Sequence, residues 1–469
     1  MYKFKDNQLS LTDFGQAVGM KLNPENRWLK KAQNIPWEEI EQRYAKLFTN
    51  RKGNVAKPLR LALGACIIQA EYGFSDEETT NMIQEHAYFQ YFCGYEEYDD
   101  SKPPFDPSLM VYFRKRLTAG VLGEINEMII TKAQLQQEKK NDDDDQDSGN
   151  GGTMIIDATC APSNIRYPQD TSLLNEARES AEKIIDALHT PGVGVKPRTY
   201  RKEARKEYLK FAKRRKRSAS FIRKAIRKQL GYLSRDLSHI DTMLAAGKIL
   251  STKLSARLDV IQKVYEQQKY MYDARTHSVE DRIVSLSQPF IRPIVRGKAG
   301  KPVEFGAKLD ISVSDGWTRL EVLSFDAYNE SMNLQDMVER YRERTGHYPS
   351  RILADKIYRN RDNLSYCKLH NIRLSGPALG RPKKNDDNRD KKQDYVDECE
   401  RVEVERRFSL AKRKCGLGLI MTKLEETISH SIAMSIVVLN LRKIQHTFLQ
   451  LLFNWVSSSA FTRKCAFVQ

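Results

Sequence analysis

The 469-residue sequence has no C-x-x-C pair, no paired histidines at metal-ligand spacing and no long uninterrupted apolar run. Its seven cysteines are scattered and odd in number, which argues against a disulfide framework and against a structural zinc site. The most apolar segment, residues 432–438, is followed too soon by Asn440, Arg442 and Lys443 for a membrane span, and favours a packed C-terminal helix. The first residues, MYKFKDNQLSL, lack the apolar stretch of a signal peptide. We therefore expect a soluble, cytoplasmic protein with no membrane partner.

A second absence concerns nucleotide chemistry. The chain has no G-x-x-x-x-G-K-[ST] phosphate loop, and the glycine-rich GVGVK at residues 192–196 does not fit that spacing. Charge is instead in excess, because 78 Lys and Arg outnumber 61 Asp and Glu and leave a net charge of +17. Such an excess points to a polyanionic partner, either nucleic acid or an acidic membrane surface.

Most of that excess lies in one segment. Residues 196–228 contain 16 Lys and Arg against two Glu, with aromatic side chains interleaved. A charge run is often only a solvated helix face, but an imbalance of this size repels itself unless phosphates neutralise it. The segment therefore predicts a nucleic-acid contact.

The N-terminal part, residues 1–136, is expected to be an all-α DNA-binding domain. Within residues 59–92, an apolar helix is followed by Gly73 and then by Ser75 and Glu78 in capping-box spacing. This pattern suits a helix-turn-helix, but the spacing alone favours an ordinary helical hairpin without DNA contact. The acidic, glycine-rich residues 137–152 are predicted to be a disordered linker.

The remaining chain predicts an α/β core interrupted by a helical insertion. The core is expected at residues 153–170 and 286–469, and the basic helical insertion at residues 171–285. A hairpin is predicted around Asp315 and Gly316, because Asp-Gly supplies the positive φ angles of a tight turn between alternating strands. Removing the insertion leaves strands and helices that alternate as in a mixed sheet covered by helices.

Two carboxylates end apolar runs in this core. TMIID ends at Asp157 and RILAD ends at Asp355, and ligands of open α/β sheets bind beyond the carboxyl ends of strands. A divalent cation would offset the cost of a charge in such a place, since Mg²⁺ takes oxygen ligands. Each aspartate alone could equally cap the following turn.

The third acid lies on a late predicted helix, residues 396–414. At about 100° per residue, Arg401, Glu405 and Lys412 share one narrow face, whereas Glu403 lies on the opposite side. A carboxylate between two cations suits a site that handles metal and phosphate. The alternative is a solvent-exposed helix with i, i+4 salt bridges.

The sequence resembles the bacterial insertion-sequence transposases of the DDE class, in the insertion-sequence-five-like group. The segments that carry the resemblance are IIDATCAPSNIRYPQD (155–170), PVEFGAKLDIS (302–312), AYNE (327–330), ILADKIYRNRDN (352–363), LSGPALGRPKK (374–384) and RVEVERRFSLAKRKCGLG (401–418), with FSDEET and YFQYFCGY in the N-terminal part. The family's signature has a tyrosine three residues before the arginine, where this chain has Glu398.

The resemblance implies a ribonuclease-H-like core, with aspartates on the first and fourth strands and the glutamate on a late helix. Asp157, Asp355 and Glu405 would hold two Mg²⁺ or Mn²⁺ ions, and Arg401 and Lys412 would contact phosphate near the scissile bond. The implied activity is cleavage of transposon DNA ends and their joining to target DNA, by a homodimer or larger assembly on double-stranded DNA. A metal-dependent nuclease of the same fold and a non-catalytic DNA-binding descendant are the alternatives.

Overall fold

The computed structural model describes residues 2–4, 21–48, 54–138, 150–192, 194–295, 303–377, 379 and 391–465, without the side chains of 137–138, 391 and 446–465. The chain divides into two compact units. The first comprises Met1–Pro162, Lys308–Ser324 and Tyr328–Gln469, and the second comprises Ser163–Ala307 and Phe325–Ala327. The predicted acidic linker lies almost entirely outside the described residues.

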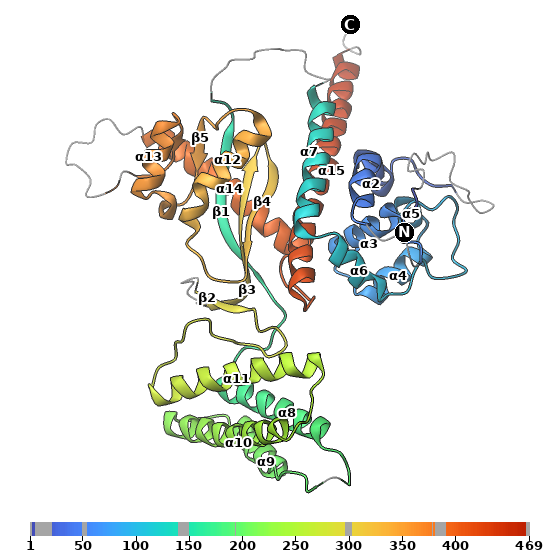
Figure 1. The fold of residues 1–469 in the computed structure, drawn as a ribbon. Helices are drawn as coiled ribbons and strands as arrows, with labels where there is room; N and C mark the ends of the chain where they lie inside the picture. Colours follow the sequence, from blue (N-terminus) through green and yellow to red (C-terminus); the bar gives the residue numbers. More distant parts are fainter. Residues whose placement is uncertain are drawn as a thin grey trace. The chain divides into compact units, whose positions relative to one another are not determined.

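The chain ahead of the sheet is helical, as predicted. Its helices are α1 (Arg27–Asn34), α2 (Trp37–Ala45), α3 (Leu59–Tyr72), α4 (Asp76–Glu85), α5 (Ala87–Phe92), α6 (Leu109–Arg116) and α7 (Ala119–Glu138) (Figure 1). α3 ends at Gly73, whose φ of 73° is the left-handed conformation that glycine adopts without strain. Ser75 then caps α4 and exchanges hydrogen bonds with Glu78, so the predicted capping box is confirmed.

The C-terminal segment forms a packed helix, α15 (Glu425–Cys465), which lies beside α7 and also contacts α3, α6 and β4 (Figure 1). A buried polar network joins these elements. The Asn440 amide donates to the Thr318 carbonyl at 2.7 Å and to Asn126 Oδ1 at 2.8 Å, and its own oxygen accepts from the Thr318 N–H at 3.0 Å. In the described part of the chain, no helix is long and apolar enough to cross a membrane.

The sheet is mixed, with the path β2-β3-β1-β5-β6 and with β4 paired to β3. β1 runs parallel to β5 and β5 parallel to β6, whereas β2 and β4 are antiparallel to β3. The strands are β1 (Thr153–Pro162), β2 (Arg292–Val295), β3 (Val303–Ser314), β4 (Trp317–Ser324), β5 (Arg351–Leu353) and β6 (Arg373–Leu374). The turn between β3 and β4 has φ angles of 52° at Asp315 and 72° at Gly316, so the predicted hairpin is confirmed.

Helices cover this sheet. Met154, Ile156 and Ile352 pack in a core with residues of α12 (Leu334–Thr345) and α13 (Arg361–Leu369). α14 (Lys391–Lys414) packs against β1 and β5 as well. Because alternate strand residues point to opposite faces, Asp157 and Asp355 point away from the α12–α13 core. The predicted α/β class, with its mixed ribonuclease-H-like core, is confirmed.

Two details of the sheet differ from the sequence prediction. β1 does not end at Asp157 but continues to Pro162, because Ala158, Cys160 and Ala161 are small enough to stay buried in the strand. β2 was not predicted, since a proline interrupts its short RPIV run; it lies at the edge of the sheet, where proline is tolerated.

The second unit contains the predicted helical insertion. Its helices are α8 (Asp170–Leu188), α9 (Arg201–Lys213), α10 (Ala219–Ala245) and α11 (Thr252–Asp273). Buried leucines, isoleucines and alanines of α8, α10 and α11 form a separate core, which includes Leu174, Leu233 and Ile261. β2 and residues 303–307 of β3 also belong to this unit. When β2 is counted with the insertion, the strands that remain in chain order are β1, β3, β4 and β5, so β5 is the fourth.

Candidate active site and nucleic-acid surfaces

Asp157 lies in the middle of β1, where it is half-buried. Its Oδ1 accepts a hydrogen bond from the Ala158 N–H at 2.8 Å. The pKa of Asp157 is raised to about 6, chiefly by burial; the carboxylates of Glu330 and Asp355 contribute to the rise, while the Ala158 N–H and Arg401 oppose it. The carboxylates of Glu330 and Asp355 therefore both lie within electrostatic reach of Asp157.

Asp355 lies two residues beyond the end of β5, after Ala354. Ile155 and Leu353 are register partners in the parallel pair, and Asp157 and Asp355 each lie two residues beyond them. The two carboxylates therefore occupy equivalent places on neighbouring strands and the same face of the sheet. Asp355 is exposed and accepts a hydrogen bond from the Lys356 N–H at 2.6 Å. It therefore caps the following turn, which is the role that the sequence analysis gave as the alternative to metal binding.

α14 brings the predicted cations to the same strand. The Lys412 ammonium donates to Thr159 Oγ1 at 2.9 Å, two residues along β1 from Asp157. The charge of Arg401 reaches Asp157, and its guanidinium lies 3.5 Å from Glu405. Thus the face of α14 that carries Arg401 and Lys412 is directed at β1.

Glu405 is exposed, with 56% of its side chain accessible to solvent. Glu403 instead pairs with Arg407 at 2.7 Å, and the Arg407 guanidinium lies beside the turn at Gly316. The two glutamates therefore have different surroundings, as the helix-face prediction requires. Across the described residues, no group of three or more His, Cys, Asp and Glu side chains is close enough to hold a metal ion.

The N-terminal half of α14 is anchored by a second set of charges. Asp397 is buried and pairs with Arg373 of β6 at 2.6 Å and with Arg351 of β5 at 3.3 Å. Glu398, which stands at the family's tyrosine position, is exposed. The helix is therefore fixed across β5 and β6 by Asp397, one residue before that position.

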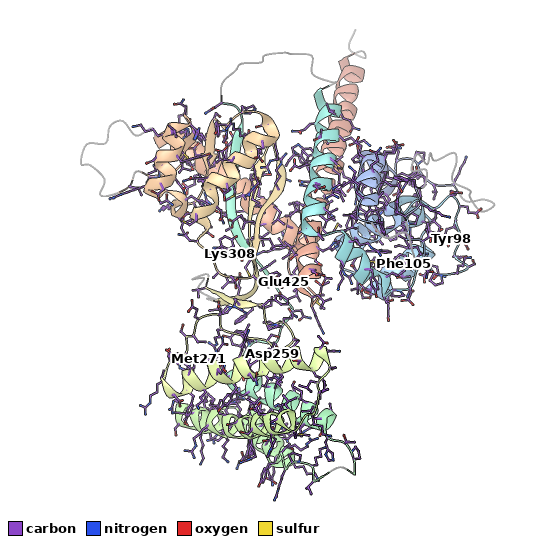
Figure 2. All side chains as sticks on the ribbon, viewed as in Figure 1. Tyr98, Phe105, Asp259, Met271, Lys308 and Glu425 are labelled. Carbon is purple, nitrogen blue, oxygen red and sulfur yellow. The ribbon has the colours of Figure 1, made fainter. Side chains whose placement is uncertain are left out.

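Glu330 is a site residue that the sequence argument did not single out, although it lies in the AYNE segment. It begins the short 3₁₀ helix η2 (Glu330–Asn333), and its carboxylate lies 2.8 Å from the Lys308 ammonium of β3. Both side chains are largely buried, and Lys308, labelled in Figure 2, also donates to the Tyr328 carbonyl at 2.8 Å. The sequence did offer one indication of this pair. Lys308 is a charged residue inside a predicted strand of mostly apolar residues, and such a residue needs an acidic partner.

A further buried carboxylate supports this corner of the site. Asp310 of β3 is fully buried and accepts from the Tyr328 hydroxyl at 2.6 Å and from the Asn333 amide at 2.8 Å. Burial raises its pKa, and the negative charge of Glu330 adds to the shift. The Tyr328 hydroxyl and the Asn333 amide therefore supply the hydrogen bonds that such a buried acid needs.

The donor chemistry of this site fits a hard divalent cation. Asp157 and Asp355 offer oxygen ligands side by side, and the pKa of Asp157 is raised mainly by burial, with the charges of Glu330 and Asp355 contributing. A cation between the carboxylates would favour their charged forms. Glu405 pairs with Arg401 here, so it would exchange that partner to join the other two acids.

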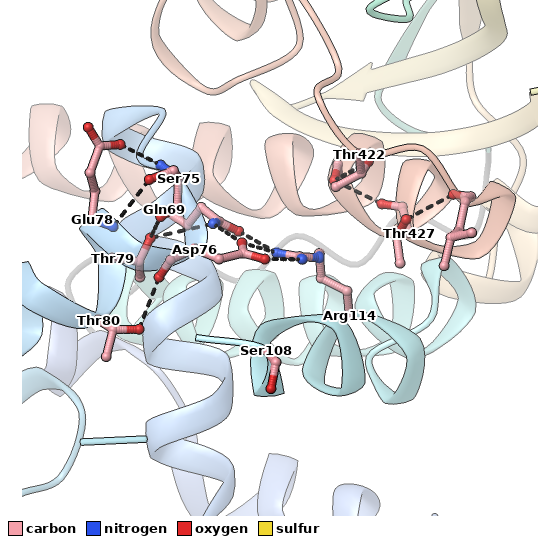
Figure 3. A network of polar contacts seen from close by, with 12 residues as sticks. Gln69, Ser75, Asp76, Glu78, Thr79, Thr80, Ser108, Arg114, Thr422 and Thr427 are labelled. Atoms are coloured by element: carbon pink, nitrogen blue, oxygen red, sulfur yellow. Dashed lines mark hydrogen bonds and ion pairs between the residues drawn. The ribbon is translucent and has the colours of Figure 1, made fainter. Parts of the chain in front are cut away.

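The N-terminal helices α3 and α4 present little that suits DNA. The first turn of α4 carries Asp76, Glu77 and Glu78, an acidic start that phosphates would repel. Arg114, from the basic cluster of α6, is held by two 2.7 Å hydrogen bonds to the Asp76 carboxylate and is nearly buried (Figure 3). These contacts favour the helical-hairpin interpretation, and DNA binding by this region stays a prediction.

The basic segment of the second unit folds as α9, a short turn and the start of α10. From α9 to the start of α10, its exposed cations are Lys202, Arg205, Lys206, Lys210, Lys213, Arg214, Arg215, Lys216, Lys224, Arg227 and Lys228. Phe211 and Phe221 stack on each other, and Arg217 and Arg214 lie 4.4 Å from the centres of these two rings. The interleaved aromatic residues therefore stabilise the turn between α9 and α10 and hold its guanidinium groups by cation–π contacts.

Two family models match parts of the chain. Residues 352–442 match the transposase DDE domain, and residues 17–116 match a transposase domain (DUF772). The DDE match includes Asp355, Arg401, Glu405 and Lys412 but not Asp157. An uncharacterized protein of Rhizobium meliloti, ORF8 in the nfe locus, is 26% identical over 201 residues, which cover 43% of this chain and 87% of that protein. No solved structure matches the chain.

Proposed function

We propose that the chain is a DDE transposase that cleaves the ends of its own element and joins them to target DNA. The observation that carries the proposal is that Asp157 on β1 and Asp355, two residues beyond β5, follow register partners of neighbouring strands and are faced by Arg401 and Lys412 of α14. The similarity of two separate segments to transposase domains supports the same conclusion. The insertion-sequence-five-like group is the resemblance that we propose within that class.

In this proposal the carboxylates of Asp157, Asp355 and Glu405 hold the divalent metal ions that DDE transposases use. Bound there, Mg²⁺ or Mn²⁺ would supply an activated water and offset the charge that develops on the departing 3′ oxygen. The residues of this chain position the DNA. Arg401 offers a planar fork to a phosphate, and Lys412 offers a point charge held in place by Thr159.

Two reactions then share the site. In cleavage, water attacks the phosphorus and the bond to the 3′ oxygen breaks, which leaves a 3′-OH and a 5′-phosphate. In joining, that 3′-OH attacks a target phosphodiester, so one phosphodiester forms as another breaks and no external energy source is needed. The exposed cations of α9 and α10 would hold the duplex through its phosphates, independently of sequence.

The test uses purified full-length protein, the DNA that flanks its coding sequence and Mg²⁺. We expect cleavage at the element's ends and, with a second duplex present, joined products. Glu405→Gln should abolish both reactions, whereas Glu403→Gln, which changes the pairs with Arg406 and Arg407, should leave them near the wild-type level. Asp157→Asn and Asp355→Asn should be as inactive as Glu405→Gln.

The outcomes separate the alternatives. Cleavage without any joined product would identify a nuclease of the same fold. DNA binding without cleavage by the wild-type protein would identify a non-catalytic descendant. Activity in Glu405→Gln together with its loss in Glu403→Gln would show that the third acid was wrongly assigned.

A further inference from the structure

Residues 415–424, which we call the α14–α15 loop, expose three large apolar side chains within six residues. Leu419, Met421 and Leu424 are 50%, 64% and 50% exposed. Leu417 and Ile420, which alternate with them, are buried. Scattered apolar residues are normal on a surface, but three in so short a segment form a projection that needs a partner.

The loop is held firmly at its base. The N–H of Leu417 donates to the Ala411 carbonyl at 3.1 Å, which closes the end of α14, and a side chain at Gly418 would collide with the Lys412 carbonyl at 2.5 Å. The Ile420 N–H donates to the Pro162 carbonyl at the end of β1 at 2.8 Å. The exposed side chains are therefore fixed relative to both catalytic elements, β1 with Asp157 and α14 with Glu405.

The loop's charge identifies the class of partner. Residues 412–424 contain Lys412, Arg413, Lys414 and Lys423 and no acidic residue. Arg413, Lys414 and Lys423 are exposed beside the apolar side chains. Protein interfaces are depleted in lysine, whereas DNA-bending proteins combine cations on phosphates with apolar wedges inserted between base steps.

We propose that Leu419 and Met421 form a wedge that enters the transposon DNA and unstacks a base step near the cleavage site. This inference rests on the proposed function. Its position follows from β1: Pro162 lies five residues beyond Asp157, which at strand geometry is about 17 Å. For B-form DNA that runs along β1, that distance corresponds to roughly five base pairs from the phosphate cleaved at the site of Asp157. Glu425, labelled in Figure 2, marks where the loop joins α15.

The test measures base unstacking directly and needs no catalysis. Duplexes from the DNA that flanks the coding sequence carry one 2-aminopurine each, at successive positions around the cleavage site, and are bound by the full-length protein in EDTA. The fluorescence of 2-aminopurine rises when the base leaves the stack. We expect a severalfold rise confined to one or two positions at roughly the predicted spacing.

The variant pair is Leu419→Ser with Met421→Ser, and the matched control is Leu369→Ser, a 75% exposed leucine at the end of α13. The double variant should lose the fluorescence rise while still binding the duplex, and the control should keep it. All three substitutions are at exposed positions, so equal thermal unfolding midpoints should show that the fold is kept.

Three results would overturn the wedge. Bound wild-type protein could leave every 2-aminopurine stacked, the double variant could give the wild-type profile, or it could change only the oligomeric state in sedimentation, which would make the loop a protein interface. These are distinct from failure of the proposed function, in which the wild-type protein would neither bind nor cleave the flanking DNA specifically.

Discussion

The Lys412 ammonium donates a hydrogen bond to Thr159 Oγ1 at 2.9 Å, across 253 residues of sequence. This bond joins the helix that carries Glu405 to the strand that carries Asp157. It also fixes the position of the Lys412 ammonium along β1, which matters because a lysine side chain is long and flexible. The relative position of two proposed catalytic elements thus depends partly on one lysine and one threonine.

Thr159→Val keeps the shape of the buried side chain and removes the acceptor. We expect a loss of about 1 kcal/mol in the free energy of unfolding, measured with urea, because one charged hydrogen bond is lost. DNA cleavage should fall severalfold, because the Lys412 ammonium loses its hydrogen bond to β1. Lys412→Met should lower cleavage further than Thr159→Val, while Lys368→Met, at an exposed position of α13, should change neither quantity. Equal cleavage by Lys412→Met and wild type would contradict a phosphate contact.

The pair of Lys308 and Glu330 should couple strongly, because its side chains are only 12% and 18% exposed. In a double-mutant cycle with Lys308→Met and Glu330→Gln, we expect a coupling free energy of about 1–3 kcal/mol in urea unfolding. Arg342 and Glu339 form an exposed pair at 3.6 Å and provide the control, for which about 0.5 kcal/mol or less is expected. If the two pairs gave the same coupling, burial would not be what makes the Lys308–Glu330 pair strong.

These two predictions show where sequence reasoning succeeded and where it stopped. The capping box at Ser75 and the Asp315–Gly316 hairpin were predictable because neighbouring residues fix their local geometry. The face shared by Arg401 and Lys412 was predictable from helical periodicity. The meeting of Lys308 with Glu330 was not, because it brings β3 and η2 together through tertiary packing that leaves no periodic signal.

The strand ends illustrate a second limit. An apolar run that ends in an acid predicts a strand terminus, and this was correct near Asp355 but wrong at Asp157, where β1 continues for five more residues. The last five residues of β1 have small side chains, which give no clear hydrophobic pattern in the sequence. The parallel register that places the two aspartates side by side also lies beyond the sequence, because it depends on which strands become neighbours.

Asp236 of α10 should make the second unit sensitive to pH. Its side chain is fully buried, and neither carboxylate oxygen has a hydrogen-bond partner among the described residues. Burial raises its pKa to about 7; Glu182 adds to the shift, and Arg178, Arg235 and Arg201 oppose it.

Because the folded pKa lies above the unfolded value of 3.8, the stability contributed by the protonated acid is complete below pH 3.8. That contribution is lost as pH rises to 7. Asp236→Asn should therefore raise the free energy of unfolding at pH 8 by on the order of 3 kcal/mol and leave it little changed near pH 4. Urea unfolding at both pH values measures this, with Asp241→Asn, at an exposed position of α10, as the control. Destabilisation of Asp236→Asn at pH 8 would show that the charged carboxylate is paired after all.

The cations of α9 should determine how DNA binding responds to salt. Lys206, Lys210 and Lys213 are exposed on α9, at the i, i+4 and i+7 spacing that places them on one face. Each phosphate contact releases condensed counterions, so replacing all three by Gln should lower the slope of log K against log salt by about 2–3.

The same loss is expected for flanking DNA and for unrelated duplexes, because phosphate contacts carry no sequence information. Lys253, Lys263 and Lys269 of α11 are exposed in the same unit, and their replacement by Gln removes the same net charge. Fluorescence anisotropy titrations across a range of salt concentrations compare the two triple variants. If both lowered the slope equally, net charge alone would explain the effect, and the basic surface of α9 would not be the contact. A reduced slope in the α9 variant alone would assign the duplex to that helix.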